Sequence, residues 1–254
     1  MRDGDILCAK WMGLNAFDMK CGAFEFMIDP YVSRDRALVH VPSEAEKYLT
    51  GSPAFILMTH SHWDHLGDVP SLIARTGAVL YASRTACNIM RHFGVEERFL
   101  HEIRPGDRFE ISGVKVTVFE SRHMEPCTQT FYEEVPDKME GPGDWRCGEV
   151  FAFLVECGGV RIFNAGSANL HLPAVDGVEC DYFLCGISRW KPGFPELISH
   201  IRFKRLIPTH HDLYTQPLSQ FVLRDDCERL REAVPGLPVM ELEVLKPTPL
   251  PPLD

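Results

Sequence analysis

Short runs of hydrophobic residues recur along the chain, with turn-forming residues between them. Runs rich in β-branched and aromatic side chains predict strands. We expect strands over 24–28, 55–58, 79–82, 114–119, 150–155, 160–163, 182–185, 206–207 and 239–242. The segment 155–162 carries Gly158 and Gly159 at its centre, which is typical of a hairpin turn.

Helical patterns lie between several of these runs. The clearest has hydrophobic residues spaced by four, three and four positions, so that they share one helix face: Leu223, Cys227, Leu230 and Val234. Pro235 and Gly236 end this helix, and shorter helices are expected over 69–74 and 85–93. Strands that alternate with helices favour a mixed α/β fold, and we expect the 254 residues to form one domain.

Two segments break the pattern. Residues 124–149 hold acids, prolines and glycines without any period, so we expect a long loop, of the kind that often serves as a lid or binding loop. Residues 246–254 are rich in proline, which predicts an extended tail.

The composition narrows the classes of partner. Hydrophobic residues make up 45% and charged residues 24%, and the net charge is −10, which disfavours binding to nucleic acid or to an anionic membrane. No apolar run approaches the roughly 20 residues that span a bilayer. The first residues lack a signal-peptide pattern, and nine cysteines occur without a C-x-x-C pair, so we expect free thiols and a cytoplasmic protein. Cys127 and Cys147 bracket the irregular segment, but their spacing alone does not require a site there.

The stretch ILMTHSHWDHLGD at 56–68 concentrates side chains that bind metals. These are His60, His62, Asp64, His65 and Asp68. Imidazole nitrogens and carboxylate oxygens suit a borderline divalent ion such as zinc. A sharp loop after a strand can turn two histidines that are two positions apart to the same side, which a helix cannot easily do. The spacing therefore predicts a metal site at the end of the strand 55–58.

This stretch resembles the signature of the metallo-β-lactamase superfamily. Four further segments follow the order of that family: WMGLNAFDMKCGAFEFMIDPYVS at 11–33, VKVTVFESRHM at 114–124, RIFNAGSANL at 161–170 and RLIPTHHDLY at 205–214. The Trp-x-Gly opening and the IDP step are most similar to the branch of ascorbate-6-phosphate lactonases and other metal-dependent hydrolases. The resemblance implies an αββα four-layer sandwich with metals at one end, between the two sheets.

The resemblance also implies the ligands of two ions. It places His60, His62 and His123 on the first ion, and Asp64, His65 and His210 on the second. An aspartate that bridges both ions in the family falls on Ser167 in this chain. Because a neutral hydroxyl is a poor zinc ligand, we expect one firm site and a second that is weak or absent.

Other residues near these segments are candidates for supporting roles. Asp29 is a candidate to brace the histidine loop by accepting hydrogen bonds, and Asp68 to cap the next helix. His210 is favoured over His211 as the ligand by its motif position. Asn169 and His171 are candidates to replace the bridging aspartate as a metal ligand. Arg189 and Lys191 are candidates to contact the substrate.

These features favour a metal-dependent hydrolase. A bound cation readies water for attack, and Asp64 is a candidate general base if the second site is empty. The branch resemblance suggests a small ester, lactone or phosphate-bearing metabolite as substrate, with phosphodiester cleavage as another option. Zn²⁺ is the expected ion, with Mn²⁺ or Fe as alternatives. A non-catalytic metal-binding or sensing relative stays open because of Ser167, and the sequence leaves a homo-oligomer possible.

Overall fold

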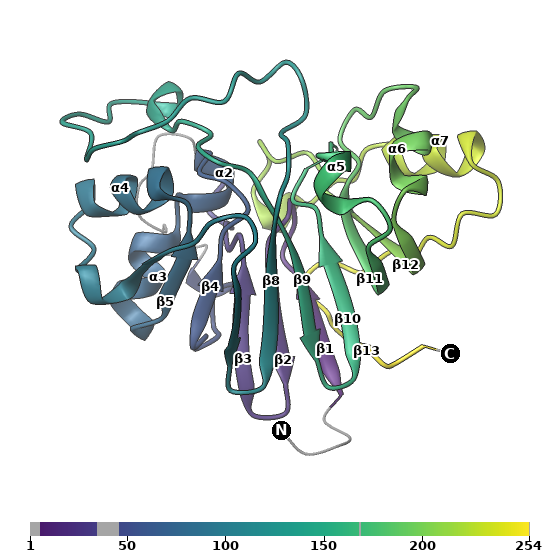
Figure 1. Cartoon of the computed structure of the whole chain (residues 1–254), viewed down its shortest axis with the longest axis horizontal. Coiled ribbons are helices and arrows are strands. Elements are labelled where there is room, and N and C mark those ends of the chain that lie inside the picture. The colour runs from purple at the N-terminus through teal and green to yellow at the C-terminus, as the bar shows by residue number, and fades with distance from the viewer. Residues whose placement is uncertain (1–5, 35–45, 168, 254) are drawn as a thin grey trace.

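Two β-sheets pack face to face between two groups of helices (Figure 1). The computed structural model describes residues 6–34, 46–167 and 169–253. The first sheet has the order β13-β1-β2-β3-β4-β5-β6 and the second the order β12-β11-β10-β9-β8-β7. The strands of the first sheet are β1 (Leu7–Trp11), β2 (Phe17–Cys21), β3 (Phe24–Ile28), β4 (Phe55–Leu57), β5 (Val79–Ala82), β6 (Leu100–Glu102) and β13 (Pro247–Leu250). Those of the second are β7 (Arg108–Ile111), β8 (Val114–Glu120), β9 (Phe151–Cys157), β10 (Val160–Asn164), β11 (Glu179–Gly186) and β12 (Arg202–Thr209).

The helices cover the outer faces of the sheets. They are α2 (Trp63–Leu66), α3 (Val69–Thr76), α4 (Arg84–His92), α5 (Leu172–Val175), α6 (Phe194–Ser199) and α7 (Asp226–Ala233), with short 3-10 turns η1 (Glu97–Phe99), η2 (Pro142–Asp144) and η3 (Leu218–Gln220). In Figure 1, α3 and α4 lie beside β4 and β5, whereas α5, α6 and α7 lie beside β10, β11 and β12. The expected four-layer αββα sandwich is confirmed.

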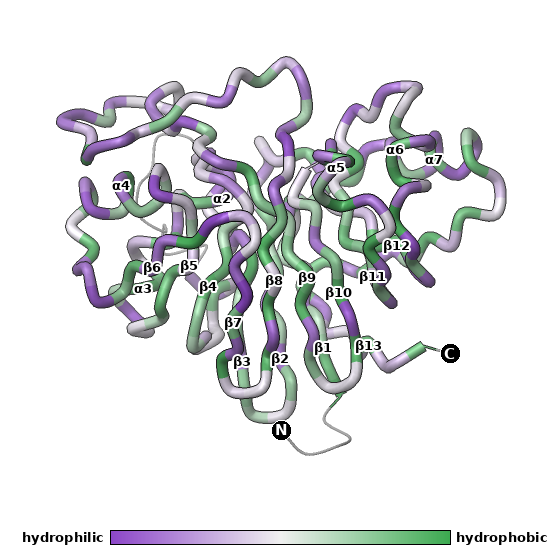
Figure 2. The backbone as a smooth tube through the Cα atoms, viewed as in Figure 1, coloured by the Kyte–Doolittle hydropathy of each residue, from purple (hydrophilic) through white to green (hydrophobic). Residues whose placement is uncertain are grey.

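Alternation along the strands explains the layers. Neighbouring side chains of a strand point to opposite faces, so a strand buried on both sides supplies two cores. In β4, Phe55 and Leu57 pack between the sheets, whereas Ile56 packs under α3 and α4. In β9, Phe153 lies between the sheets and Leu154 faces the other helical layer. Figure 2 shows hydrophobic stretches concentrated along these strands.

Strand direction brings distant segments to one edge of the molecule. Strand β4 runs parallel to β3 and β5, and β10, β11 and β12 run parallel to one another. Strand β8 runs in the same direction as β10, because both pair antiparallel with β9. The segments that follow β4, β8, β10 and β12 are therefore able to meet at the same edge, where the predicted ligands lie.

The sequence expectations hold for most elements but fail at two. The segment 239–242 is not a strand, since only Val239 forms an isolated bridge, to Leu206. Helix α7 begins at Asp226, so Leu223 lies outside it and is 42% exposed. The hairpin around Gly158 is confirmed, because β9 and β10 pair antiparallel.

The two irregular segments, 124–149 and the tail from 246, differ in structure. Residues 124–149 contain only the short turn η2, and the loop packs on α4, where Trp145 stacks on Phe93 with ring centroids 5.4 Å apart. The tail is extended, and its residues 247–250 add a strand beside β1. Among the residues that the structure describes, every helix is too short or too polar to cross a membrane.

Candidate metal centre

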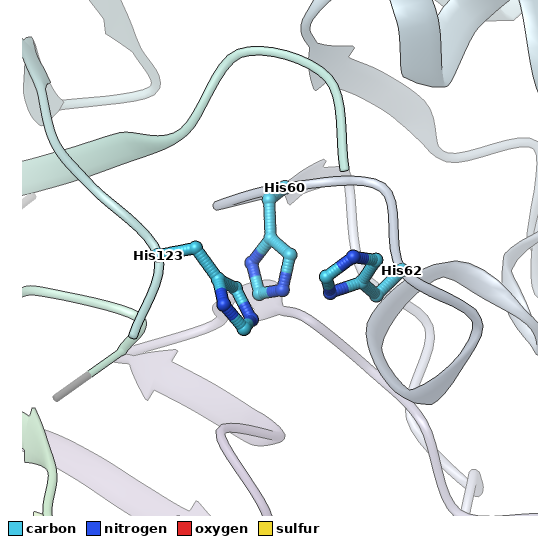
Figure 3. Close-up of side chains that lie close together, drawn as sticks. All are labelled: His60, His62 and His123. Carbon is cyan, nitrogen blue, oxygen red and sulfur yellow. The ribbon is translucent and has the colours of Figure 1, made fainter. Parts of the chain in front are cut away.

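Three histidines from two loops converge at the edge of the sandwich (Figure 3). His60 and His62 lie between β4 and α2, and His123 follows β8. Their ring centroids are 4.7–4.9 Å apart, and one nitrogen from each lies within 4.8 Å of the others. Tetrahedral zinc with Zn–N bonds of about 2.0–2.1 Å needs nitrogens roughly 3.4 Å apart, so a small inward movement completes the site.

Hydrogen bonds orient two of the three rings toward a common point. Nδ1 of His60 lies 3.1 Å from the Thr59 hydroxyl, and Nδ1 of His123 lies 2.8 Å from the Met124 carbonyl oxygen. The carbonyl can only accept, so His123 carries its proton on Nδ1 and leaves Nε2 free to bind an ion. Among the described residues, the buried Nε2 of His60 has no hydrogen-bond partner. An unpartnered buried nitrogen at this point fits a metal ligand.

The surroundings keep these imidazoles neutral. Burial and the neighbouring His123 lower the pKa of His62 to about 4. Burial, followed by the adjacent histidines, lowers the pKa of His60 well below its usual value, and burial also lowers the pKa of His123. Because a metal binds the neutral imidazole, all three rings are in the binding form at neutral pH.

A second group lies beside the first. One ligand atom each from Asp64, His65 and His210 lies within 4.8 Å of the other two, and Asp64 Oδ2 is 3.5 Å from His210 Nε2. Burial raises the pKa of Asp64, but the contact with His210 and the nearby His65 outweigh it and hold that pKa below its usual value. The group is therefore an ionised carboxylate between two imidazoles.

Asp29 supports both groups of ligands through hydrogen bonds. Its carboxylate accepts hydrogen bonds from the Thr59 backbone N–H at 2.8 Å, the Thr59 hydroxyl at 2.5 Å and the Asn15 side-chain amide at 2.7 Å. His65 Nδ1 lies 2.7 Å from the same carboxylate, which raises the pKa of His65 against the lowering effect of its burial. Asp29 thus occupies the bracing position expected of it.

Replacing Asp29 with asparagine is expected to weaken metal binding by about 10–100-fold, because the amide places an NH₂ group against donors. The dissociation constant is measured by competition with a chelator. The matched control is Asp176→Asn, which alters another aspartate with a histidine partner, His200, far along the chain. Equal affinity in the Asp29 variant and the wild type would contradict the bracing role.

Ser167 stands where the resemblance implies a bridging aspartate. It follows β10, is buried and lines the same pocket as the histidines. Its hydroxyl accepts a hydrogen bond from the Met124 N–H at 3.0 Å, so it anchors the segment that carries His123. Asn169 donates to the His123 carbonyl oxygen at 3.1 Å, and His171 Nε2 lies 3.7 Å from Glu120 Oε1. Neither residue belongs to the two ligand groups.

The chain reverses at His210 and separates it from His211. His210 has a φ of +55°, a conformation that a non-glycine residue adopts only where other contacts enforce it. Its N–H donates to the Leu14 carbonyl oxygen at 2.8 Å. His211 instead stacks on Trp11, with ring centroids 5.3 Å apart. The structure therefore brings His210, and not His211, to the predicted ligands.

A cationic residue that the sequence reasoning missed supports this turn. Arg224 donates from Nη2 to the His210 carbonyl oxygen at 3.0 Å and to the Ser188 hydroxyl at 2.5 Å, and from Nε to Asp226 at 2.7 Å. It lines the histidine pocket but its guanidinium is already held by these three partners. Its position before a short helix gives no sequence signal for this role.

The remaining candidates divide between two neighbouring pockets. Arg189 is exposed and lines the histidine pocket, whereas Lys191 lines an adjacent pocket with Trp190.

The expected helix cap by Asp68 is wrong, because its carboxylate accepts no hydrogen bond from the first turn of α3. It accepts instead from the N–H groups of residues 32 and 33 at 2.6 and 2.9 Å, and so fastens the segment after β3.

Comparisons with known proteins agree with this architecture. Residues 25–218 match the family model described as the beta-lactamase superfamily domain. A UPF0173 metal-dependent hydrolase of Paracoccus denitrificans is 25% identical over 94% of this chain and 98% of its own length. One of Methanopyrus kandleri is 30% identical over 44% of this chain and 46% of its length. The solved structure of Igni18, a metallo hydrolase of Ignicoccus hospitalis, superposes with a TM-score of 0.62 at 16% identity, over 96% of this chain and 98% of the other.

Proposed function

Because this chain belongs to the beta-lactamase superfamily domain family, we propose that it is a metal-dependent hydrolase whose ion is held by His60, His62 and His123. The observation that carries the proposal is the convergence of three imidazole nitrogens beside Asp64 in one pocket. The names of the relatives, metal-dependent hydrolases, support the same reaction class.

The residues divide the chemical work. When bound, a divalent cation lowers the pKa of water toward about 7 and polarises a carbonyl or phosphoryl oxygen. His60, His62 and His123 would hold this ion, since their imidazole nitrogens converge at the pocket. Asp64, which is ionised, orients the attacking water and accepts its proton, and His210 Nε2 lies 3.5 Å away to share that charge.

We propose Zn²⁺ as the ion, in one firm site. Three imidazoles suit zinc, and Mn²⁺ or Fe are the alternatives in mixed nitrogen and oxygen surroundings. The second group, Asp64, His65 and His210, lacks a bridging carboxylate because Ser167 stands in that place. A hydroxyl that already accepts the Met124 N–H cannot replace that charge, so this second group binds an ion weakly or not at all.

The proposed substrate is a small ester, lactone or phosphate-bearing metabolite. Arg189 reaches the histidine pocket from an exposed loop, where a guanidinium can bind a carboxylate or phosphate of the substrate. The sequence resemblance to the ascorbate-6-phosphate lactonase branch supports the same class. The acidic net charge of −10 disfavours nucleic acid as the substrate.

Replacing Arg189 with alanine is expected to raise KM about tenfold for an anionic substrate and to leave kcat within about twofold, because a single charge-assisted contact contributes roughly 1.5–3 kcal/mol. Lys191→Ala on the same loop is the matched control, with a smaller effect expected because it lines the adjacent pocket. Steady-state kinetics of both variants measure this. Unchanged KM in the Arg189 variant would remove its role in substrate binding.

A panel of nitrophenyl ester, phosphodiester and lactone substrates tests the reaction class. We expect turnover of at least one substrate class when zinc or manganese is added. This turnover is expected to be lost when a chelator is added, and to be absent in the His123→Ala variant. A metal-loaded chain that is inactive on the whole panel would favour the non-catalytic binding or sensing role that Ser167 leaves open.

A further inference from the structure

Two cysteines from the long loop meet at His62. Cys127 and Cys147 lie near the two ends of the segment 124–149. Their sulfur atoms and a nitrogen of His62 all lie within 4.8 Å of one another, and Cys127 Sγ is 3.9 Å from His62 Nε2. Cys147 is buried and Cys127 is half-buried, so the cluster forms a partly sheltered set of three metal-binding side chains.

The backbone holds this cluster in place. The Cys147 carbonyl oxygen accepts hydrogen bonds from the Ser61 N–H at 3.0 Å and from the Ser61 hydroxyl at 2.9 Å. Gly148 follows with a φ of +67°, and a Cβ there would lie 2.7 Å from Thr85 Cβ and 2.8 Å from Ser61 Oγ. The glycine therefore permits the loop to lie directly against the histidine loop. Cys147 is fixed beside His62 by these contacts.

We propose that Cys127, Cys147 and His62 form a separate site for a soft or borderline ion, of which Zn²⁺ and Cd²⁺ are examples. Thiolates select such ions, and two cysteines with a histidine leave a fourth position for water or another ligand. With Zn–S bonds of about 2.3 Å, tetrahedral sulfur atoms lie roughly 3.8 Å apart. The ligand atoms of this cluster all lie within 4.8 Å of one another, so a small inward movement completes the site.

His62 belongs to both the three-histidine group and the thiol group. An imidazole has two nitrogens, and Nε2 is the one that lies 3.9 Å from Cys127. A neutral imidazole has a lone pair on only one of its nitrogens, so this ring binds one of the two ions at a time, and both together only as an imidazolate whose N–H proton has passed to solvent.

Cobalt absorption tests the thiolate site without reference to activity. Co²⁺ bound to thiolates gives a sulfur-to-cobalt charge-transfer band in the near ultraviolet, which imidazole and carboxylate ligands do not give. The purified full chain, kept reduced with a phosphine, is titrated with Co²⁺. The band is expected in the wild type, at half or less of that intensity in Cys127→Ser and Cys147→Ser, and absent in the double variant.

The matched control is Cys8→Ser, since Cys8 is partly exposed, as Cys127 is, and lies on β1 outside the cluster. This variant is expected to keep the full band. Cys127→Ser keeps the test decisive if a change at buried Cys147 prevents folding. Absence of the band in the wild type, or full intensity in a folded Cys127→Ser chain, would overturn the proposal.

Discussion

Replacing Asp64 with asparagine is expected to lower kcat by about 10²–10⁴-fold while the ion on the three histidines stays bound. Asparagine has nearly the same shape but cannot accept the proton of the attacking water. The groups that hold the first ion come from His60, His62 and His123, so its affinity does not depend on this carboxylate. Kinetics on a substrate identified by the panel, together with metal content, measure the two effects separately.

Asp176→Asn is the control for this change, because Asp176 also pairs with a histidine, His200, at 2.8 Å and lies outside the pocket. Its kcat is expected to equal that of the wild type. Activity of Asp64→Asn within about twofold of the wild type would exclude the proton-accepting role. Loss of the ion from this variant would show that Asp64 belongs to the first site after all.

Restoring the bridging carboxylate by Ser167→Asp is expected to add one equivalent of tightly bound metal per chain. A carboxylate supplies two oxygens and a negative charge between the two ligand groups, and one oxygen can still accept the Met124 N–H. Elemental analysis after dialysis compares the variant with the wild type. Ser167→Asn is the control, since it has similar size without charge and is expected to add no metal.

Turnover of Ser167→Asp then separates two interpretations of the serine. If activity rises when the second ion is bound, the absence of the carboxylate at position 167 had lowered the activity of the site. A fall would mean that the serine suits the reaction of this chain. Metal content that stays equal to that of the wild type would contradict the view that Ser167 weakens the second group.

The sequence predicted those parts of the site that depend on local spacing. His60, His62, Asp64 and His65 lie so close together that a strand followed by a sharp loop is enough to gather them. His123 could be placed only through the resemblance to a known family, because its approach depends on how two sheets pack. The structure adds the physical reason, which is that the loops after β4 and β8 meet, so that ligand nitrogens of His60 and His123 lie within 4.8 Å of each other.

Other features had no signal in the sequence. The tail strand β13 contains Pro247 and Pro249, and proline lacks the N–H that marks an ordinary strand, so only a position at the sheet edge allows it. The contact between Cys127 and His62 could not be predicted, because Cys127 lies in an irregular loop without periodicity. The brace by Arg224 depends on a turn whose conformation is set by its tertiary contacts.

Anomalous diffraction at the zinc absorption edge, from crystals of the wild-type chain grown with zinc, tests the central claim most directly. The account predicts a peak about 2.0–2.1 Å from one nitrogen each of His60, His62 and His123. A map without a peak among these three rings, at full zinc loading, would contradict it.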